Sequence, residues 1–450
     1  MGILDNIVRI SNYYRRRYAV YDSDRLRDHN KQFEKGLIRL SDSCYLAVGY
    51  SGANVGLIVG HASLIVIDTT ESTAAAESVL AQIQSISDLP VSAIIYTHGH
   101  RDHISGARVF AGDKNCTVIA SSRFRPDLTA RDGGRFPFAC LVERTKRQFG
   151  IGLSVGDENI NIGVGPANRP LKGLGDGFIP PNQMIAEVST TISVAGTRLT
   201  FAMAPGETDD HLVIMHEADK VLFSGDNFYC SFPNLYAIRG TRYRNFEQWS
   251  ASLKLMRDLG CEVLAPGHTM PVFGAGNVAA ALTQYSEAID SVIEQCISRI
   301  DQGLTPDQFA PSVVLPTHLR ESPFLQEFYG TVEWAARGYF AGEFGWFDGN
   351  PTNLFRLKAT EHASRMLDLA GGKERVAAAL QQALENSEWQ WSLTLADMLL
   401  DTGHTDKSVI EAKAYALRRR ASETDNAPAR NYFLSSAKSL ESMIEREDSK

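Results

Sequence analysis

One segment of seven residues concentrates side chains that bind metal ions. Residues 97–103 read Thr-His-Gly-His-Arg-Asp-His and contain three of the chain's 11 histidines. His98 and His100 are two positions apart, so on an extended backbone their imidazoles point to the same side and can share one ion. Asp102 and His103 lie further along the loop, within reach of a second ion. The spacing therefore predicts a metal centre; the alternative is a polar loop with incidental histidines.

Further candidate ligands follow other apolar, strand-like runs. Strands that end at the same edge of a sheet bring the residues after them together, so the ordered set predicts one site at one sheet edge. The residues in question are Asp68 after Leu64–Ile67, His98 after Val91–Tyr96, Glu207 after Leu199–Ala204, Asp226 after Val221–Ser224, and His268 after Glu262–Ala265.

In their order, these motifs resemble those of the metallo-β-lactamase superfamily over about residues 40 to 275. The third motif reads Pro-Gly-Glu-Thr at residues 205–208, where the superfamily usually carries His. With Glu207 at this position, the motif resembles that of the zinc-dependent alkyl sulfatases. Residues 345–351, Gly-Trp-Phe-Asp-Gly-Asn-Pro, resemble the signature of that family's dimerisation domain. One departure is Asp226, where the alkyl sulfatases usually carry Glu.

The resemblance implies an α/β fold, an αββα metallo-β-lactamase sandwich followed by an all-α dimerisation domain. Short β-type runs alternate with helical segments such as Thr73–Ile86 up to about residue 275, and helical periodicity dominates afterwards. We expect an N-terminal arm at residues 1–39, a catalytic domain at 40–275, a helical dimerisation domain at 276–422 and a helical tail at 423–450. Residues 150–185 are rich in Gly, Pro and Asn and are expected to form an insertion near the active-site mouth.

The resemblance also implies two zinc ions per chain, with a hydroxide between them as the nucleophile. Asp68 would accept a hydrogen bond from a ligand histidine and fix its tautomer, although a strand-end turn cap is an alternative role. The implied ligands are His98, His100 and Glu207 for the first ion, Asp102, His103 and His268 for the second, and Asp226 as a bridge.

Asn234 and Arg239 match the family's sulfate-binding positions, and a guanidinium grips two sulfate oxygens at once. Asp102, Asp226 and Arg239 are the predicted catalytic residues. Arg244 is a further candidate for substrate binding, with a solvated basic surface as its alternative. His211 is either a proton donor or a histidine hydrogen-bonded to the backbone. The sequence identifies no general acid.

The expected activity is hydrolysis of an alkyl sulfate ester, a small-molecule substrate, to alcohol and sulfate. A lactone, thioester or phosphodiester substrate on the same metal site is the first alternative. An iron oxidoreductase and a catalytically silent dimeric scaffold are the others. Iron is disfavoured because diiron relatives usually carry Glu where His100 stands, and a silent scaffold is disfavoured by the complete ligand set.

Composition narrows the choice of partners. A net charge of −8 disfavours nucleic acid, because the superfamily's nucleases need a basic groove. The six cysteines form no CxxC pair, which indicates free thiols in a reducing compartment. No apolar run of membrane-spanning length and no secretory signal occur, so we expect a cytoplasmic protein without a membrane span. The dimerisation signature implies a homodimer.

Overall fold

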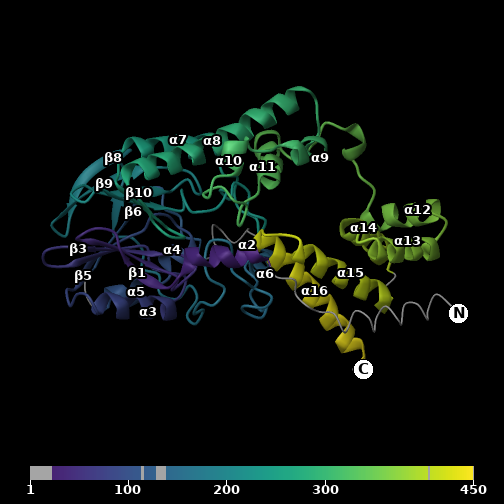
Figure 1. The fold of residues 1–450 in the computed structure, drawn as a ribbon, viewed down its shortest axis with the longest axis horizontal. Coiled ribbons are helices and arrows are strands. Elements are labelled where there is room, and N and C mark those ends of the chain that lie inside the picture. Colours follow the sequence, from purple (N-terminus) through teal and green to yellow (C-terminus); the bar gives the residue numbers. More distant parts are fainter. Residues whose placement is uncertain (1–22, 113–115, 128–137, 404–405, 449–450) are drawn as a thin grey trace. The chain divides into compact units, whose positions relative to one another are not determined.

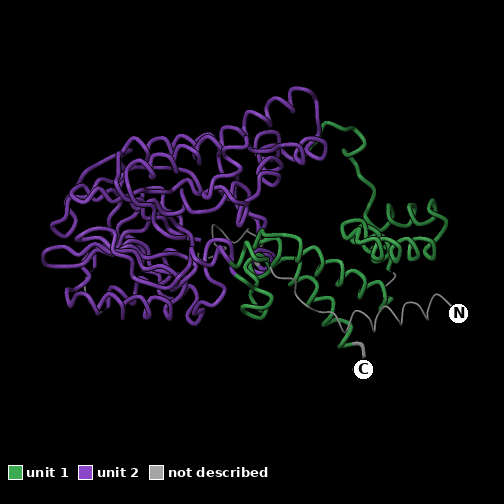
Figure 2. The backbone as a smooth tube through the Cα atoms, in the orientation of Figure 1, with its two compact units in different colours: residues 1–27, 145–160, 347–450 green, residues 28–144, 161–346 purple. Residues whose placement is uncertain are grey.

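The computed structural model describes residues 23–112, 116–127, 138–403 and 406–448. The first 22 residues of the predicted N-terminal arm lie outside this set. The chain divides into two compact units, which Figure 2 colours separately. Unit 2 comprises residues 28–144 and 161–346; unit 1 comprises the residues up to 27, residues 145–160 and the residues from 347 onward. The predicted domain boundaries stay predictions.

Unit 2 contains two β-sheets (Figure 1). In the seven-stranded sheet, strands β1 to β4 pair antiparallel and β4 to β7 pair parallel. In the six-stranded sheet, β11 and β12 are parallel and the other neighbours are antiparallel. The strands are β1 (Gly36–Arg39), β2 (Cys44–Val48), β3 (Val55–Val59), β4 (Leu64–Ile67), β5 (Val91–Ile95), β6 (Thr117–Ser121), β7 (Gln183–Ile185), β8 (Ser189–Val194), β9 (Thr197–Met203), β10 (Leu212–His216), β11 (Val221–Gly225), β12 (Val263–Pro266) and β13 (Val272–Phe273).

The two sheets pack face to face, and helices cover their outer faces. Ile58 and Ile95 of the first sheet share a buried core with Phe201 and Ile214 of the second. Helices α3 (Thr73–Gln84) and α5 (Ala107–Ala111) cover the first sheet, while α7 (Phe246–Asp258) and α8 (Ala275–Asp301) cover the second. Strands buried on both faces, such as β4, β10 and β11, are continuous apolar runs for this reason. The αββα sandwich is confirmed.

The segments between these elements contain further short helices, which are distributed over both units. Among the described residues, no helix is both long enough and apolar enough to cross a membrane. The segments are α2 (Asp24–Asp28), η1 (His29–Phe33), α4 (Arg101–Ile104), α6 (Phe138–Gln148), α9 (Pro306–Phe309), η2 (Ala310–Ser312), α10 (Thr317–Arg320), α11 (Val332–Phe344) and η3 (Pro351–Asn353).

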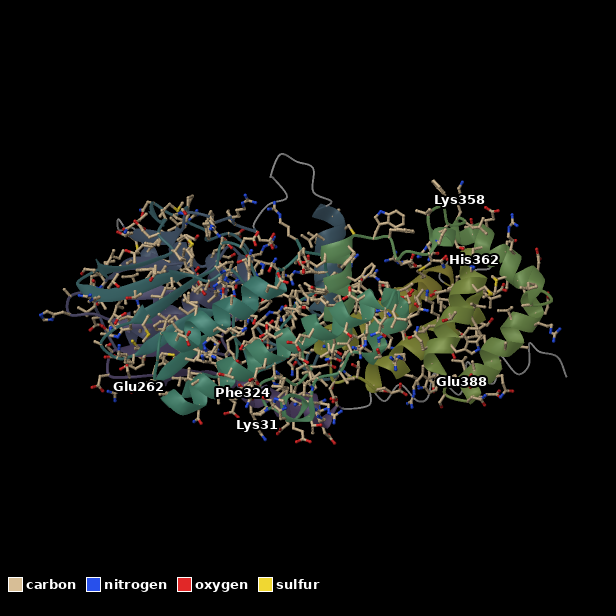
Figure 3. The ribbon with its side chains drawn as sticks, turned by 90° about the horizontal axis from the view of Figure 1, so that it is seen from above. Lys31, Glu262, Phe324, Lys358, His362 and Glu388 are labelled. Atoms are coloured by element: carbon tan, nitrogen blue, oxygen red, sulfur yellow. The ribbon has the colours of Figure 1, made fainter. Side chains whose placement is uncertain are left out.

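Unit 1 is helical and has its own apolar core. The helices are α12 (Ala359–Leu369), α13 (Lys373–Glu385), α14 (Trp389–Asp401), α15 (Lys407–Ser422) and α16 (Ala427–Asp448). Leu380, Leu393 and Leu417 are buried in one cluster from three of these helices. Figure 3 labels Lys358 and His362 at α12 and Glu388 before α14, which carry exposed polar side chains away from that core. The helical texture expected after residue 275 is confirmed.

Candidate metal centre

Five strands deliver the candidate ligands to one edge of the sandwich. β4 leads to Asp68, β5 to the histidine segment, β9 to Glu207, β11 to Asp226 and β12 to His268. Strands β4 and β5 are parallel, as are β11 and β12, so within each pair the residues after the strands emerge at the same edge. This is the arrangement that the strand-end pattern predicts.

All seven predicted ligands lie in overlapping groups whose ligand atoms are within 4.8 Å of one another. Asp226 and His103 each belong to two groups and therefore connect them. The three groups are His98, His103 and Asp226; Asp102, His103 and His268; and His100, Glu207 and Asp226. The structure thus brings these side chains together, while their roles as zinc ligands remain a prediction.

Asp226 contacts three of the predicted histidine ligands. Its Oδ1 lies 3.1 Å from His103 Nε2, and its Oδ2 lies 3.2 Å from His268 Nε2 and 3.6 Å from His98 Nε2. Asp102 Oδ2 lies 3.5 Å from His268 Nε2, and Glu207 Oε1 lies 3.8 Å from His100 Nδ1. Several nitrogen–oxygen pairs are therefore longer than good hydrogen bonds, as expected for atoms that share an ion at about 2.0–2.2 Å from each.

Three of the predicted histidine ligands contact a polar group through the ring nitrogen that points away from the cluster. The Nδ1 atoms of His98, His103 and His268 lie 3.0, 2.7 and 2.7 Å from Thr97 Oγ1, Asp68 Oδ2 and the Gly52 carbonyl oxygen. Each Nε2 therefore faces the carboxylates. In the described structure His103 Nε2, Asp226 Oδ1 and Glu207 Oε2 are buried without a hydrogen-bond partner. Buried polar atoms of this kind are normally satisfied, so the donor set fits bound cations.

The pKa values reflect a buried, charged cluster. Burial lowers the pKa of His100 well below its usual value, and Arg239 and Arg244 lower it further. Burial also opposes charge on His268, but Asp226 and Asp102 outweigh it and raise the pKa of His268 to about 9. The carboxylates of this cluster thus attract positive charge, which a bound cation also provides.

Asp68 contacts the ring of His103, which is the arrangement that its predicted orienting role needs. Besides its contact with His103, it accepts hydrogen bonds from Thr97 N at 2.9 Å and Thr97 Oγ1 at 2.8 Å. Its φ of 58° is unusual for a non-glycine residue and is tolerated best by Asn and Asp. Asp68 therefore links the end of strand β4 to the segment after β5 and to a predicted ligand.

Gly52 was missed in the sequence, although its carbonyl faces His268. Its backbone N donates to Glu71 Oε1 at 3.0 Å, and Glu71 in turn pairs with Arg169 Nε at 2.8 Å. Arg169 lies in the predicted insertion, which thereby supports the centre from behind. Backbone carbonyls carry no signal in a sequence, so only the fold reveals this support.

His211 is hydrogen-bonded to the backbone, as one of its two expected roles requires. Its Nε2 accepts from the backbone N of Asp226 at 3.0 Å, and its ring stacks on His98 with centroids 4.8 Å apart. Burial lowers the pKa of His211 to about 3, so the ring is neutral at pH 7. His211 thus positions the central carboxylate.

The predicted substrate-binding residues lie beside this cluster. Asn234 is buried, and its backbone N donates to Tyr229 Oη at 2.7 Å. Arg239 is half-buried; burial opposes its charge, but Tyr329, Asp127 and Glu207 raise its pKa overall. Asp127 and Tyr329 escaped sequence reasoning because neither belongs to a recognisable motif.

The structure contradicts one of the two interpretations of Arg244. It is 4 % exposed, so a solvated basic surface is wrong for this residue, whereas Arg242 is exposed. Arg244 Nη2 lies 2.8 Å from Glu207 Oε1, and Nη1 donates to the backbone carbonyl of Asn234. Arg242 and Arg244 are separated by one residue and look alike in the sequence. The path of the folded chain buries Arg244 and leaves Arg242 exposed, so the sequence alone does not distinguish them.

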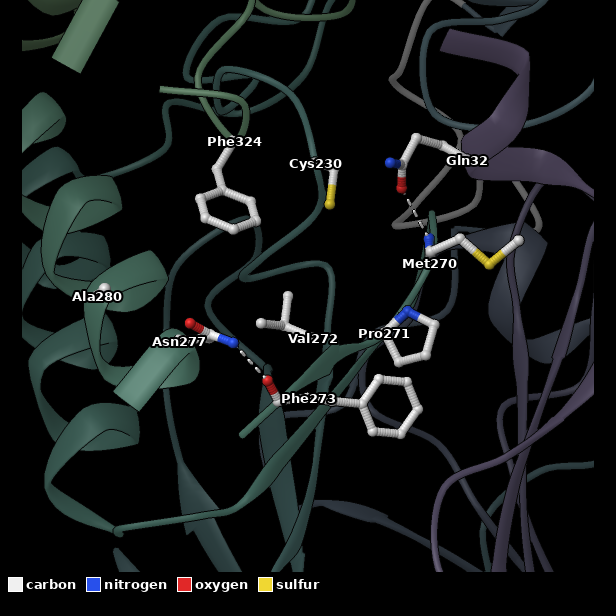
Figure 4. Close-up of a pocket in the computed structure, with 9 residues that line it drawn as sticks. All are labelled: Gln32, Cys230, Met270, Pro271, Val272, Phe273, Asn277, Ala280 and Phe324. Atoms are coloured by element: carbon white, nitrogen blue, oxygen red, sulfur yellow. Dashed lines mark hydrogen bonds between the residues drawn. The ribbon is translucent and has the colours of Figure 1, made fainter. Parts of the chain in front are cut away.

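A cavity of about 300 Å³ lies next to the segment that follows His268 (Figure 4). Gln32 Oε1 accepts from the backbone N of Met270 at its rim, and Cys230 and Phe324 contribute apolar wall. None of the seven predicted ligands lines it. The cavity is therefore separate from the metal centre.

A second cluster, Cys44, His216 and Asp219, also brings ligand-type atoms together. Its acceptors are already used, however. Asp219 Oδ2 accepts from the hydroxyls of Ser41 and Ser43, and the Asp219 backbone N donates to His216 Nδ1 at 3.1 Å. Burial raises the pKa of the Cys44 thiol to about 11. We interpret this cluster as a hydrogen-bonded link between two turns.

Comparison with known proteins gives two family matches. Residues 48–268 match the family described as metallo-beta-lactamase superfamily, and residues 305–443 match the family described as alkyl sulfatase dimerisation. A linear primary-alkylsulfatase from Pseudomonas sp. is 32% identical over 397 residues, which cover 86% of this chain and 74% of the relative. An (R)-specific secondary-alkylsulfatase from Pseudomonas sp. is 25% identical over 92% of this chain and 64% of the relative.

A solved structure agrees with the fold. That of a stereoselective inverting sec-alkylsulfatase from Pseudomonas sp. superposes with a TM-score of 0.82 at 24% identity, covering 90% of this chain and 65% of that one. This chain thus spans about three quarters of the first relative and just under two thirds of the other two proteins.

Proposed function

Because this chain belongs to the alkylsulfatase family of the metallo-beta-lactamase superfamily, we propose that it hydrolyses alkyl sulfate esters to an alcohol and sulfate. One observation carries the proposal: Glu207, the residue that departs from the superfamily's usual histidine, lies in the same buried group as His100 and Asp226. Arg239 and Arg244 act electrostatically on that group, so a site for an anion adjoins the centre.

We propose that the centre holds two zinc ions. When bound, zinc acts as a Lewis acid and lowers the pKa of a coordinated water to about 7. Side chains of this protein form the two halves of the site. Asp226 contacts both halves, and Asp102 completes the half around His103 and His268. The proposed ligands are His98, His100 and Glu207 on one side, Asp102, His103 and His268 on the other, and Asp226 between them.

We propose that Arg239 and Asn234 bind the sulfate group. A guanidinium offers planar, paired N–H donors that match two sulfate oxygens. Burial opposes the charge of Arg239, but nearby acidic groups such as Asp127 raise its pKa overall, so the guanidinium stays charged inside the protein. Binding the anion next to the centre would hold the ester close to the nucleophile, which is the main contribution that positioning makes to catalysis.

The test is sulfate release by zinc-loaded protein from hexyl to dodecyl sulfate and 2-octyl sulfate. We expect release by the native chain and a loss of about 100-fold or more in Arg239→Ala. Glu207→Ala should lose both activity and bound zinc. The exposed Arg242→Ala serves as the control and should retain activity. Two bound zinc ions without sulfate release from any ester would refute the proposed substrate.

Another ester class is the second candidate, because a fungal thioesterase from Emericella nidulans is 24% identical over 48% of this chain. If the substrate is a thioester or a lactone, Arg239→Ala should keep full activity on it. Metal analysis of the same sample distinguishes a zinc hydrolase from an iron oxidoreductase, whose bound iron would colour the protein. We further propose a homodimer formed through the helical region, in line with the match to the dimerisation family. We also propose a cytoplasmic location.

A further inference from the structure

Arg244 is buried against a predicted metal ligand. The side chains of Arg244 and Glu207 are 2% and 3% exposed, and Nη2 and Oε1 lie 2.8 Å apart. A guanidinium is costly to bury and persists in such a place only when it is paired. Packing of the sandwich core does not require a buried charge. The buried guanidinium of Arg244 therefore indicates a function in the metal centre.

The pair restricts how Glu207 can turn. The Glu207 backbone N donates to Asn227 Oδ1 at 3.2 Å, and Arg244 holds the carboxylate through Oε1. Oε2 is buried and has no hydrogen-bond partner in the described structure. Oε1 itself lies 3.8 Å from His100 Nδ1, so Arg244 holds the carboxylate oxygen that faces this predicted ligand.

The same guanidinium reaches the sulfate-binding loop. Its Nη1 donates to the backbone carbonyl of Asn234, whose N–H is held by Tyr229 Oη. A lysine ammonium is a compact point charge and lacks the fixed fork that serves two separated acceptors. The two contacts made by one guanidinium therefore suit arginine better than lysine.

We infer that Arg244 is a positioning residue, which orients Glu207 for the metal and ties it to the loop that carries Asn234. This inference rests on the proposed metal centre and assigns Arg244 no contact with the substrate. Partners that orient metal ligands typically contribute 10- to 100-fold to metal affinity.

The experiment measures zinc affinity by chelator competition on the full chain, with Arg242→Gln as the matched control. We expect Arg244→Gln to weaken one of the two zinc sites by about 10- to 100-fold and to leave the other unchanged. Arg244→Lys, which keeps the charge, should recover part of the loss and covers the case in which the glutamine variant fails to fold. Equal weakening of both sites would overturn the inference.

A double-mutant cycle separates this role from a general structural one. If Arg244 acts through Glu207, adding Arg244→Gln to Glu207→Gln should change zinc affinity little, since the two losses are then not additive. Full additivity would contradict the inference. No ester is present in this titration, so failure of sulfate release would refute the proposed substrate without touching the zinc result.

Discussion

At the scale of single residues, the centre depends on acceptors behind the imidazoles as much as on the ligands. His103 rests on a carboxylate, His98 on a hydroxyl and His268 on a backbone carbonyl. The carboxylate stabilises positive charge on its ring, so the three rings differ in basicity although they share one cluster.

Replacing Asp68 tests the strongest of these acceptors. Asp68→Asn keeps the side-chain shape and tolerates the positive φ but removes the charge that faces His103 Nδ1. We expect zinc affinity to fall by about 10- to 100-fold, measured by chelator competition. Unchanged affinity would mean that Asp68 serves only as the turn cap of β4.

His29 gives a pH-dependent contribution to stability away from the centre. Its Nε2 donates to the Gly163 carbonyl oxygen at 2.9 Å and its ring stacks on Phe328, and burial lowers its pKa from 6.5 to about 4. The unfolded chain therefore binds the proton more readily. The stabilisation is complete above pH 6.5 and is lost as the pH falls toward 4, by up to about 3 kcal/mol.

The measurement compares urea midpoints of the native chain and His29→Gln, which keeps a donor but does not titrate. The difference between the two should change between pH 7 and pH 4.5 and stay constant above pH 7. A difference that is constant over the whole range would show that His29 does not titrate in the folded state as expected.

At the scale of elements, the sequence predicts the strands and the clustering of the candidate ligands, because the strands follow local rules and the candidates follow the strands. β5 is an apolar run followed directly by His98, and the helical periods of α3 and α7 are visible in the chain. Contacts between distant segments follow no local rule. The bond between Gly52 and His268 joins residues 216 positions apart, and the burial of Arg244 depends on the same kind of closure.

Glycine in the ligand loops is another element-scale constraint. A Cβ on Gly99, between His98 and His100, would lie 1.9 Å from the Arg125 carbonyl oxygen. Because backbone cannot move aside like a side-chain tip, Gly99→Ala should destabilise the protein by at least about 2 kcal/mol and reduce bound zinc. Gly276→Ala in α8, where nothing lies within 4 Å, is the control and should be neutral or stabilising in a thermal melt. Equal melting temperatures for the two variants would contradict the prediction.

At the scale of the whole molecule, we expect exposed aromatic side chains around the dimerisation signature to contribute to the homodimer. Trp346 is 73% exposed and Phe355 is 95% exposed, and both lie within or next to the predicted dimerisation signature. Large aromatic side chains are enriched at protein interfaces and costly in water. A homodimer would cover them.

Phe355→Ser and Trp346→Ser should therefore shift the protein from dimer toward monomer, measured by sedimentation velocity across a concentration series. Circular dichroism should stay unchanged, because neither side chain belongs to a buried core. The exposed Leu369→Ser, outside the signature, is the control. A dimer of unchanged affinity in both variants would place the interface elsewhere.

Unit 1 is assembled from segments that are far apart in the chain. Arg418 binds Glu158 at 3.1 Å across 260 positions, and Leu153 is buried with Ala421 and Leu434. During synthesis at about 5–20 residues per second, the segment around Glu158 would leave the ribosome roughly 10 to 50 s before its partners exist. Throughout that interval its apolar side chains would be accessible to chaperones and proteases, so the yield of native protein in a cell depends on how fast the last helices arrive.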